Sequence, residues 1–411
     1  MKAIPINQII CNDNILVIKS WFDNCIDSII TDPPYALEFM GKGWDKVLPS
    51  VEVWEECLRV AKPGAFMLCF GGTRTFHRLT CAIEDAGWQI RDCLMWLYGS
   101  GFPKSHNISK AIDKASGAKR KVVGSGRSGK AETHKSSYQM SQQKDNTFGG
   151  KFDITAPTSN LAKLWDGYGT GLKPAWEPII VAMKPMDGNF AKNAEKYGVA
   201  GLNIDGGRID FEEGGTAASN PKLRVEGGYK TETGDRIFCQ GVLGKKNTMV
   251  ENVKKGGRWP ANLILDEEAG AMLDEQSGER PISGRKNAGV CKNDMKGAAF
   301  GDNTRGSIPY YDSGGASRFF YVAKAGKKER GENNNHPTVK PLKLMEYLCR
   351  LLKPPSGGVL LDPFCGSGST LMAAFNTGWD YIGIDKESEY VEIAKKRVSS
   401  CKEQRKYQMF A

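Results

Sequence analysis

The sequence has few histidines, no closely paired cysteines and no long apolar run. Its 4 histidines and 11 cysteines include no Cys-x-x-Cys pair, so the spacing of a zinc site or a disulfide framework is absent. We expect free thiols in a reducing compartment and no bound metal. No stretch approaches the roughly 18 consecutive apolar residues of a membrane helix, and residues 1–10 lack the apolar run of a secretory signal. These absences predict a cytoplasmic protein.

What the sequence has in excess is positive charge, and this charge is uneven. With 57 Lys+Arg against 47 Asp+Glu, the 411-residue chain carries a net charge of +10. Residues 101–186 hold most of the imbalance, with 14 basic and 6 acidic side chains. Its richest part, a basic loop near 110–151, is diluted with Gly, Ser and Gln and cannot bury enough apolar surface to fold alone. It is either a solvated loop or an arm that binds the phosphates of a polyanion.

Both ends of the chain alternate short apolar runs with amphipathic segments, which is the βαβ pattern of a parallel sheet. The expected strands are 27–31, 65–70, 359–361 and 381–384, and the expected helices are 51–61, 76–86, 342–352, 369–376 and 388–399. Between the two ends, residues 198–317 contain 22 of the 48 glycines, a density that suits loops and short strands. The sequence therefore predicts one α/β domain, built from both chain ends and interrupted by an irregular middle.

The first chemistry-bearing stretch is Asp32-Pro33-Pro34-Tyr35, directly after the expected strand 27–31. At the carboxyl end of a parallel strand, a polar residue faces the ligand crevice. The two prolines fix the backbone and remove two N–H donors, which leaves carbonyl acceptors beside the carboxylate of Asp32. This cluster fits a flat ligand with an exocyclic amino group, held by the acceptors and stacked on Tyr35. The alternative is a rigid Asp-Pro turn with a surface tyrosine.

The second stretch is a glycine-rich turn, residues 361–370, between an expected strand and an expected helix. Its glycines let the backbone approach a cofactor, and the helix start offers free N–H groups. Leu371 stands where a dinucleotide fingerprint needs its third glycine, and no P-loop lysine follows, which argues against a bound triphosphate. The next strand ends at Asp385, whose carboxylate is placed to hold two ribose hydroxyls.

The third stretch is His336-Pro-Thr-Val-Lys-Pro341, just before the expected helix 342–352. The Thr338 hydroxyl and the Lys340 ammonium are suited to grip a small carboxylate. Beside a ribose site, a carboxylate site indicates an amino-acid tail. Together these features point to S-adenosylmethionine as the cofactor.

Three motifs, in their order along the chain, resemble those of the permuted β class of DNA amino-methyltransferases. They are Asp-Pro-Pro-Tyr at 32–35, His-Pro-Thr-x-Lys-Pro at 336–341 and Asp-Pro-Phe-Cys-Gly-Ser-Gly at 362–368. The resemblance implies a Rossmann-like mixed sheet with a catalytic half (1–186), a target-recognition region (187–335) and a cofactor half (336–411). Three further stretches, 96–104, 172–178 and 317–324, resemble phage and prophage members of this group. Asn12-Asp13 resembles the class's Gly-Asp segment near the cofactor adenine, with Asn in place of Gly.

The implied activity is methyl transfer from S-adenosylmethionine to N6 of an adenine flipped out of double-stranded DNA. The alternatives are N4 of cytosine, a class that more often has Ser before Pro-Pro-Tyr; methylation of a protein amide, usually with Asn there; and DNA binding without catalysis. The sequence leaves open whether the protein forms a homodimer. The predicted catalytic residues are Asp32, Pro33, Pro34 and Tyr35. The predicted cofactor residues are Asp13, His336, Thr338, Lys340, Asp362, Phe364, Gly366, Gly368, Ser369 and Asp385, and the predicted DNA-binding residues are Lys119, Arg120, Lys121 and Arg127.

Overall fold

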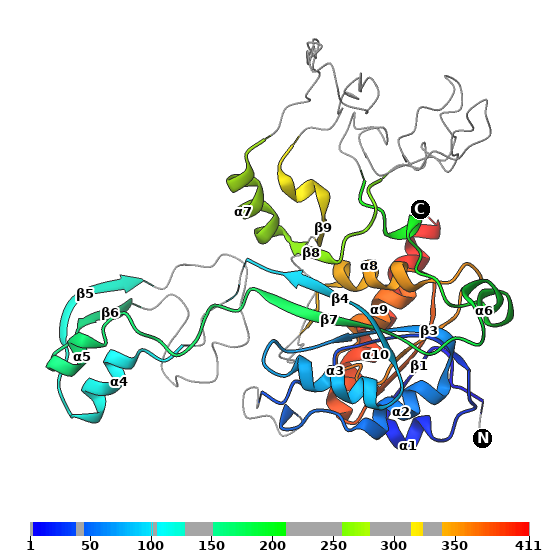
Figure 1. The fold of residues 1–411 in the computed structure, drawn as a ribbon, viewed down its shortest axis with the longest axis horizontal. Helices are drawn as coiled ribbons and strands as arrows, with labels where there is room; N and C mark the ends of the chain where they lie inside the picture. The colour runs from blue at the N-terminus through cyan, green and yellow to red at the C-terminus, as the bar shows by residue number, and fades with distance from the viewer. Residues whose placement is uncertain are drawn as a thin grey trace, which may run out of the picture.

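The structure, a computed structural model, describes residues 3–37, 45–99, 101, 105–127, 151–210, 257–279, 314–323 and 339–410. Within these residues the centre of the molecule is a nine-stranded sheet of order β1-β11-β10-β2-β3-β7-β4-β8-β9 (Figure 1). The strands are β1 (Gln8–Cys11), β2 (Ile26–Thr31), β3 (Ala61–Phe70), β4 (Gln89–Leu97), β7 (Trp176–Met183), β8 (Leu263–Asp266), β9 (Tyr321–Ala323), β10 (Val359–Asp362) and β11 (Asp380–Asp385). β7 runs antiparallel to its neighbours β3 and β4, and the other neighbouring pairs are parallel.

The two ends of the chain share this sheet, as the sequence predicted. β10 and β11 from the C-terminal end lie between β1 and β2 from the N-terminal end. From the adjacent pair β10 and β2, the chain continues in opposite directions, to β11 on one side and to β3 on the other. In open α/β sheets such a reversal of strand order opens a crevice at the carboxyl ends of the strands.

Helices cover both faces of the sheet because the strand residues are apolar on both faces. α1 (Asn14–Ile18), α2 (Val51–Val60) and α3 (Phe76–Asp85) cover one face, where Trp54 and Leu79 pack with Ile29 and Met67. α8 (Leu342–Leu352), α9 (Ser369–Asn376) and α10 (Ser388–Phe410) cover the other, where Leu348 and Leu371 pack with residues such as Ile30 and Leu68. These six helices include every helix expected for the chain ends. α10 continues beyond the predicted end at 399.

The described parts of residues 187–335 contain short elements: α6 (Phe190–Tyr197), the 3-10 turns η4 (Asp205–Gly207) and η7 (Ala316–Phe319), α7 (Glu267–Ser277), and the strands β8 and β9. Of the two strands, β8 lies within 198–317, where short strands were expected, and β9 lies beyond it. They extend the central sheet beyond β4 instead of forming a layer of their own. No helix within the described ranges has the length and apolar character needed to cross a membrane.

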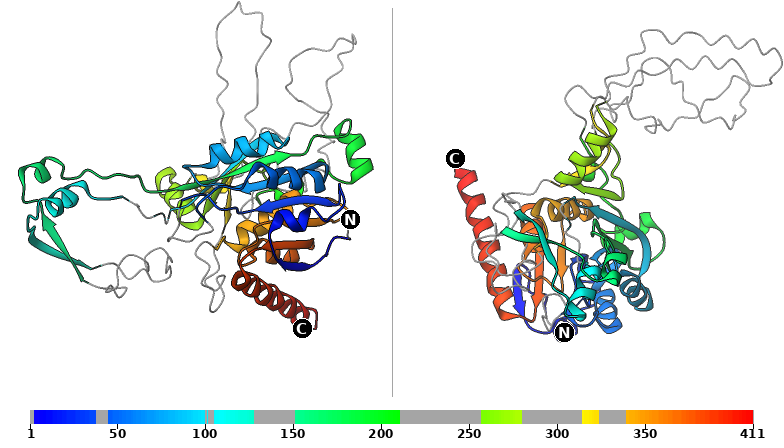
Figure 2. Two further views of the ribbon diagram at one scale, coloured as in Figure 1. Left: turned by 90° about the horizontal axis from the view of Figure 1, so that it is seen from below. Right: turned by 90° about the vertical axis from the view of Figure 1, so that its left-hand side faces the viewer.

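A small lobe projects from the sheet between β4 and β7 (Figures 1 and 2). It contains α4 (Ile108–Ala115), β5 (Lys121–Arg127), β6 (Lys151–Ala156) and α5 (Asn160–Leu164), with β5 and β6 paired as an antiparallel ribbon. The expectation of a loop near 110–151 is wrong for its described parts, 110–127 and 151. A buried hydrogen-bond network between Asp113 and Arg120 orders these residues without an apolar core.

Candidate active site

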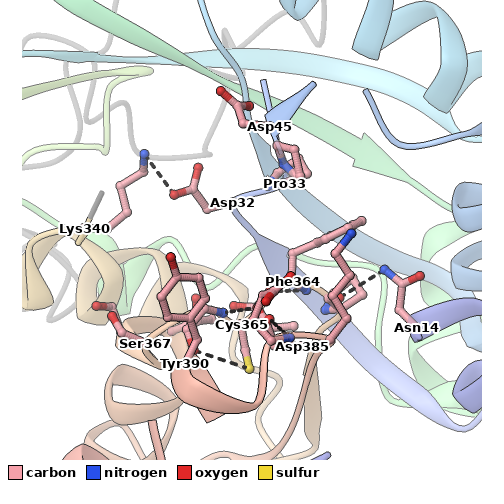
Figure 3. Close-up of a pocket in the computed structure, with 18 of the residues that line it drawn as sticks. Asn14, Asp32, Pro33, Asp45, Lys340, Phe364, Cys365, Ser367, Asp385 and Tyr390 are labelled. Carbon is pink, nitrogen blue, oxygen red and sulfur yellow. Dashed lines mark hydrogen bonds and ion pairs between the residues drawn. The ribbon is translucent and has the colours of Figure 1, made fainter. Parts of the chain in front are cut away.

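The candidate site is a pocket at the carboxyl edge of the sheet, where β1, β2, β10 and β11 all end. Parallel strands present their final residues at one edge, so residues far apart in the sequence meet there. Asp13 follows β1, Asp32 follows β2, Asp362 ends β10 and Asp385 ends β11, and all four line the same pocket. In Figure 3, Asp32 and Lys340 lie on one side of this pocket, and Asn14 and Asp385 lie on the other.

A turn after β2 forms the first wall of the pocket. The Tyr35 hydroxyl donates a hydrogen bond to Asp32 Oδ1 over 2.6 Å. The buried carboxylate of Asp45 holds the turn from behind, since its oxygens accept from the backbone N–H groups of Tyr35 at 2.7 Å and Leu37 at 3.3 Å. Ala36 between them has φ 55°, in the left-handed region that residues with a side chain rarely adopt. Asp45 thus stabilises a backbone shape that places Asp32 and Tyr35 at the sheet edge.

Lys340 connects this turn to β7. Its Nζ lies 3.1 Å from Asp32 Oδ2 and donates to Glu177 Oε2 at 2.8 Å and to the Tyr35 hydroxyl oxygen at 3.1 Å. An ammonium has three N–H bonds, and these three oxygens match all of them. Lys340 thus neutralises Asp32 and Glu177, and its contact with a cofactor carboxylate stays a prediction for a residue that lines the pocket.

Burial and charge together set the protonation of this cluster. Burial alone would lower the pKa of Lys340, but the carboxylates of Asp32 and Glu177 outweigh it and raise the pKa above its ordinary value. Burial also raises the pKa of Tyr35 well above its ordinary value, and the same two carboxylates add to the effect. Lys340 is therefore a cation and Tyr35 a neutral hydrogen-bond donor across the physiological pH range.

Asp385 occupies the opposite wall, at the end of β11. Its Oδ2 accepts from the backbone N–H of Gly366, and its Oδ1 accepts from that of Glu387, both at 2.9 Å. Burial raises the pKa of this carboxyl above its ordinary value. A carboxylate can accept about four hydrogen bonds, so Asp385 keeps the capacity to bind hydroxyls of a ligand in the pocket.

Asp13 and Phe364 border the pocket beside Asp385. Asp13 caps α1 by accepting from the backbone N–H of Leu16 at 3.2 Å. The neighbouring Asn14 side chain donates to the backbone carbonyl of Pro363 at 3.1 Å, which ties α1 to the turn after β10. Asp13 from the N-terminal end and Phe364 from the C-terminal end thus lie in the same wall of the pocket as Asp385.

The chain matches a known protein family over most of its length. The DNA methylase family, described for N6 and N4 enzymes, matches residues 26–396, which is most of the chain. The chain belongs to this family. Two relatives are the Type II methyltransferases M2.DpnII of Streptococcus pneumoniae, 43% identical over 74 residues, and M2.LlaDCHI of Lactococcus lactis subsp. cremoris, 36% identical over 89 residues.

These matches are partial. They cover 18% and 22% of this chain and 27% and 33% of the relatives, so the chain spans about a third or less of the length of these two proteins. Among solved structures, that of the M1.HpyAVI–SAM complex is 16% identical, with a TM-score of 0.39 and coverage of 95% of this chain and 98% of that one. A DNA modification methylase of Thermus thermophilus is 13% identical, with a TM-score of 0.39 and coverage of 96% and 95%.

Asp362 connects the two chain ends through its side chain. Its Oδ1 accepts from the Thr31 hydroxyl at 2.8 Å and from the backbone N–H of Phe364 at 3.1 Å. The carboxyl is almost fully buried, and burial raises its pKa to about 7. Asp362 thus lies in the pocket wall, with these contacts fixing the turns that carry Asp32 and Phe364.

The Asp362→Asn variant is expected to remove a pH dependence of stability. Folding raises the pKa of Asp362 from 3.8 to about 7. The stabilising contribution of this group is therefore fully present below the unfolded value and is lost as pH rises through the folded value. The unfolding free energy of the wild type relative to the variant should fall with rising pH, by up to about 1.4 kcal/mol per pH unit. Urea unfolding between about pH 5 and pH 8 measures this difference, and a relative stability that rises over this range contradicts the assignment.

The glycines of the turn have two different roles. Gly366, Ser367 and Ser369 line the pocket. Gly368 has φ 81°, and a Cβ on it would lie 2.8 Å from the Cβ of Ala394 in α10. Gly368 is not among the residues that line the pocket, and its lack of a side chain makes room for the helix α10.

Gly368→Ala is expected to lower the free energy of unfolding by roughly 2–4 kcal/mol, from the left-handed backbone and the contact with Ala394. The affinity of the folded variant for S-adenosylmethionine should stay within a few-fold of the wild type. Chemical unfolding and calorimetry with the cofactor measure the two quantities. A stable variant with greatly weakened cofactor affinity would show that Gly368 contacts the cofactor.

Two of the predicted DNA-binding residues, Lys119 and Lys121, are exposed in the lobe. Arg120 is not: its guanidinium bonds the buried Asp113 and Ser109, so the prediction for this residue is corrected to a structural role. Arg127 lies at the end of β5, in a part whose backbone alone is described. The predicted cofactor residues His336 and Thr338 lie outside the described residues.

Glu177 and Asp45 are among the residues of the site that the sequence did not predict. Glu177 lies in the stretch 172–178, which carried a resemblance but received no role. The available signal was an acidic side chain at the start of β7, in a segment with few acidic residues. Asp45 contacts Tyr35 across ten positions of sequence, and no motif surrounds it.

Proposed function

We propose that this protein is a DNA methyltransferase that transfers a methyl group from S-adenosylmethionine to the exocyclic N6 of adenine. The observation that carries the proposal is the single pocket shared by the Asp32–Tyr35 turn and the wall of Asp385 and Gly366. One wall offers acceptors and an aromatic ring for an amino-bearing base, and the other offers a carboxylate and a glycine turn for a nucleoside. Membership of the DNA methylase family agrees with this chemistry.

The cofactor wall fits S-adenosylmethionine by the chemistry of its groups. The carboxylate of Asp385 suits the ribose hydroxyls, and the ring of Phe364, packed at 6.2 Å from that of Trp54, supplies an apolar surface. Asp13 adds an acceptor at the same end of the pocket. When bound, the cofactor supplies a methyl group that is already activated by its sulfonium. The protein then has to orient the base and exclude water.

Asp32 is the residue that holds the reacting amine. One lone pair of Oδ1 accepts from Tyr35, and Oδ2 contacts Lys340. A carboxylate has about four acceptor positions, so positions remain for an N–H of the target. Such an acceptor draws electron density toward the amine nitrogen as its bond to carbon forms and can receive its proton afterwards. A base in duplex DNA must be flipped out to reach this position.

Adenine is proposed over cytosine because Asp precedes Pro-Pro-Tyr, where the cytosine-N4 members that this motif resembles more often have Ser. The family itself covers both N6 and N4 methylases. The match to Type II methyltransferases supports action at a specific DNA sequence. By its place between the two halves of the chain, the region 187–335 is assigned to target recognition, and the order of the motifs supports the permuted class.

Transfer of tritium from labelled S-adenosylmethionine to duplex DNA tests the proposal. Purified protein is incubated with a mixed-sequence bacterial DNA, and label is counted in DNA and in protein. Label in DNA that disappears with the Asp32→Ala variant is the expected result. A wild-type protein that binds the cofactor and DNA but transfers no label contradicts the enzymatic proposal and favours a DNA-binding role.

A further inference from the structure

The lobe between β4 and β7 begins at the edge of the candidate active site. Leu97 at the end of β4 pairs with Trp176 at the start of β7, and Trp176 is the neighbour of Glu177. Further out, the neck of the lobe is closed by a hydrogen bond from the backbone N–H of His106 to the Thr170 hydroxyl, and by one from that of Thr170 to the Ser105 hydroxyl. The lobe is thus an ordered extension of the edge that carries the pocket (Figures 1 and 2).

The interior of the lobe is polar. Asp113 is fully buried and accepts hydrogen bonds from Arg120, from the backbone N–H groups of Thr158 and Ser159, and from the Ser159 hydroxyl. Arg120 also donates to Thr155 and so joins α4 to β6. This network holds the helices and the ribbon together, which leaves the apolar side chains of the ribbon free to face outward.

One face of the ribbon carries exposed apolar side chains. Phe152 and Ile154 on β6 are 51% and 47% exposed. They pair with Gly126 and Gly124 on β5, and a Cβ on Gly126 would clash with the Phe152 ring. Exposed apolar groups gathered in this way mark a surface that binds a partner.

Exposed lysines lie on several elements of the lobe. Lys119 and Lys121 are exposed at the start of the ribbon, and Lys110, Lys114 and Lys163 are exposed on α4 and α5. Against these stand the exposed carboxylates of Asp153 and Asp166. Among its described side chains, the surface of the lobe is therefore positive, which favours a polyanion as its partner.

We propose that the β5–β6 ribbon is a contact surface for duplex DNA, with Lys119 and Lys121 on phosphates and the Phe152–Ile154 face in the groove. This inference rests on the proposed function for the choice of DNA as the polyanion. The major groove admits a two-stranded β-ribbon, and apolar side chains contact thymine methyl groups there. A two-fold contact with a second copy is disfavoured, because it brings the same positive surface patch of both copies together.

Binding of a labelled mixed-sequence duplex at several salt concentrations tests the surface. In the Lys119→Ala/Lys121→Ala variant, the slope of log affinity against log salt should flatten by about 1.8, at roughly 0.9 for each phosphate that is no longer neutralised. The Phe152→Ala/Ile154→Ala variant should bind more weakly at every salt concentration with its slope unchanged. The matched control, Lys395→Ala/Lys396→Ala on α10, removes the same charge from exposed positions and should leave the slope as in the wild type.

Three outcomes would overturn the proposal: ribbon variants with wild-type affinity and slope, a control variant that changes the slope equally, or a ribbon variant whose defect is loss of self-association in sedimentation. Circular dichroism and cofactor affinity, measured on each variant, establish that the protein is folded. Failure of the proposed function is distinguishable, because it leaves DNA binding and its salt slope measurable while the wild type transfers no methyl group.

Discussion

Asp32→Ala is expected to reduce methyl transfer to DNA by at least ~10²-fold, because it removes the acceptor that aligns the target amine. The affinity for S-adenosylmethionine should remain measurable, since Asp385 and Gly366 lie on the opposite wall of the pocket. The loss should appear in kcat more than in KM, because alignment acts on the reacting geometry. Single-turnover transfer and calorimetry with the cofactor measure the two effects.

Removing Asp32 leaves Lys340 with Glu177 as an ion-pair partner at 2.8 Å, so the folded structure should persist. Glu84→Ala on α3 is a suitable control, because it removes an exposed carboxylate from a helix outside the pocket lining and outside the lobe. Near wild-type turnover in Asp32→Ala would show that another group aligns the amine. Equal loss of cofactor affinity would place the cofactor against the Asp32 wall.

Lys340→Met is the second substitution with a large expected effect. It leaves the carboxylates of Asp32 and Glu177 together without their shared cation, and breaking a buried pair in this way costs about 3 kcal/mol of unfolding free energy. The lower part of the usual range applies because Asp32 and Glu177 are 19% and 23% exposed. Methyl transfer should fall as well, because the Asp32 side chain loses the contact that orients it. Urea unfolding and single-turnover kinetics give the two numbers.

The double variant Lys340→Met/Glu177→Gln distinguishes this charge coupling from simple loss of packing. Neutralising one carboxylate removes much of the repulsion, so the double variant should be more stable than Lys340→Met alone by at least about 1 kcal/mol. Lys343→Met, on the first turn of α8, is the matched control, because that lysine is 55% exposed and its ion pair with Glu346 should contribute less than about 1 kcal/mol. A double variant less stable than the single one would show that Glu177 is not coupled to Lys340.

The parts of the fold that could be predicted are those in which the sequence pattern is local. β2, β10 and β11 are apolar runs bounded by polar residues, and α8 and α9 were predicted with the bounds that they have in the structure. The pairing of the chain ends followed from the two βαβ patterns. The pocket followed as well, because Asp32, Asp362 and Asp385 all come at the ends of strands that are neighbours in the sheet.

The remaining parts depend on contacts between distant positions. Lys340 was interpreted from its own motif, but its partner Glu177 is 163 positions away, and only the folded sheet shows that the two meet. Gly368 looks like a cofactor glycine in sequence, whereas its neighbour is Ala394 in α10. Arg120 is of a residue type that often binds phosphate, but in the structure its guanidinium donates a hydrogen bond to the buried Asp113. In each case the residue type was informative, and the partner was not local.

Identification of the methylated nucleoside is the measurement that tests the central claim most directly. Mixed-sequence duplex DNA is incubated with the wild-type protein and S-adenosylmethionine carrying a deuterated methyl group, digested to nucleosides and analysed by mass spectrometry, with Asp32→Ala as the parallel control. The account predicts deuterated N6-methyl-2′-deoxyadenosine, absent from the control. Deuterated N4-methyl-2′-deoxycytidine would contradict the choice of adenine, and a methyl group on cytosine C5, or on no nucleoside at all, would contradict the roles given to Asp32 and its pocket.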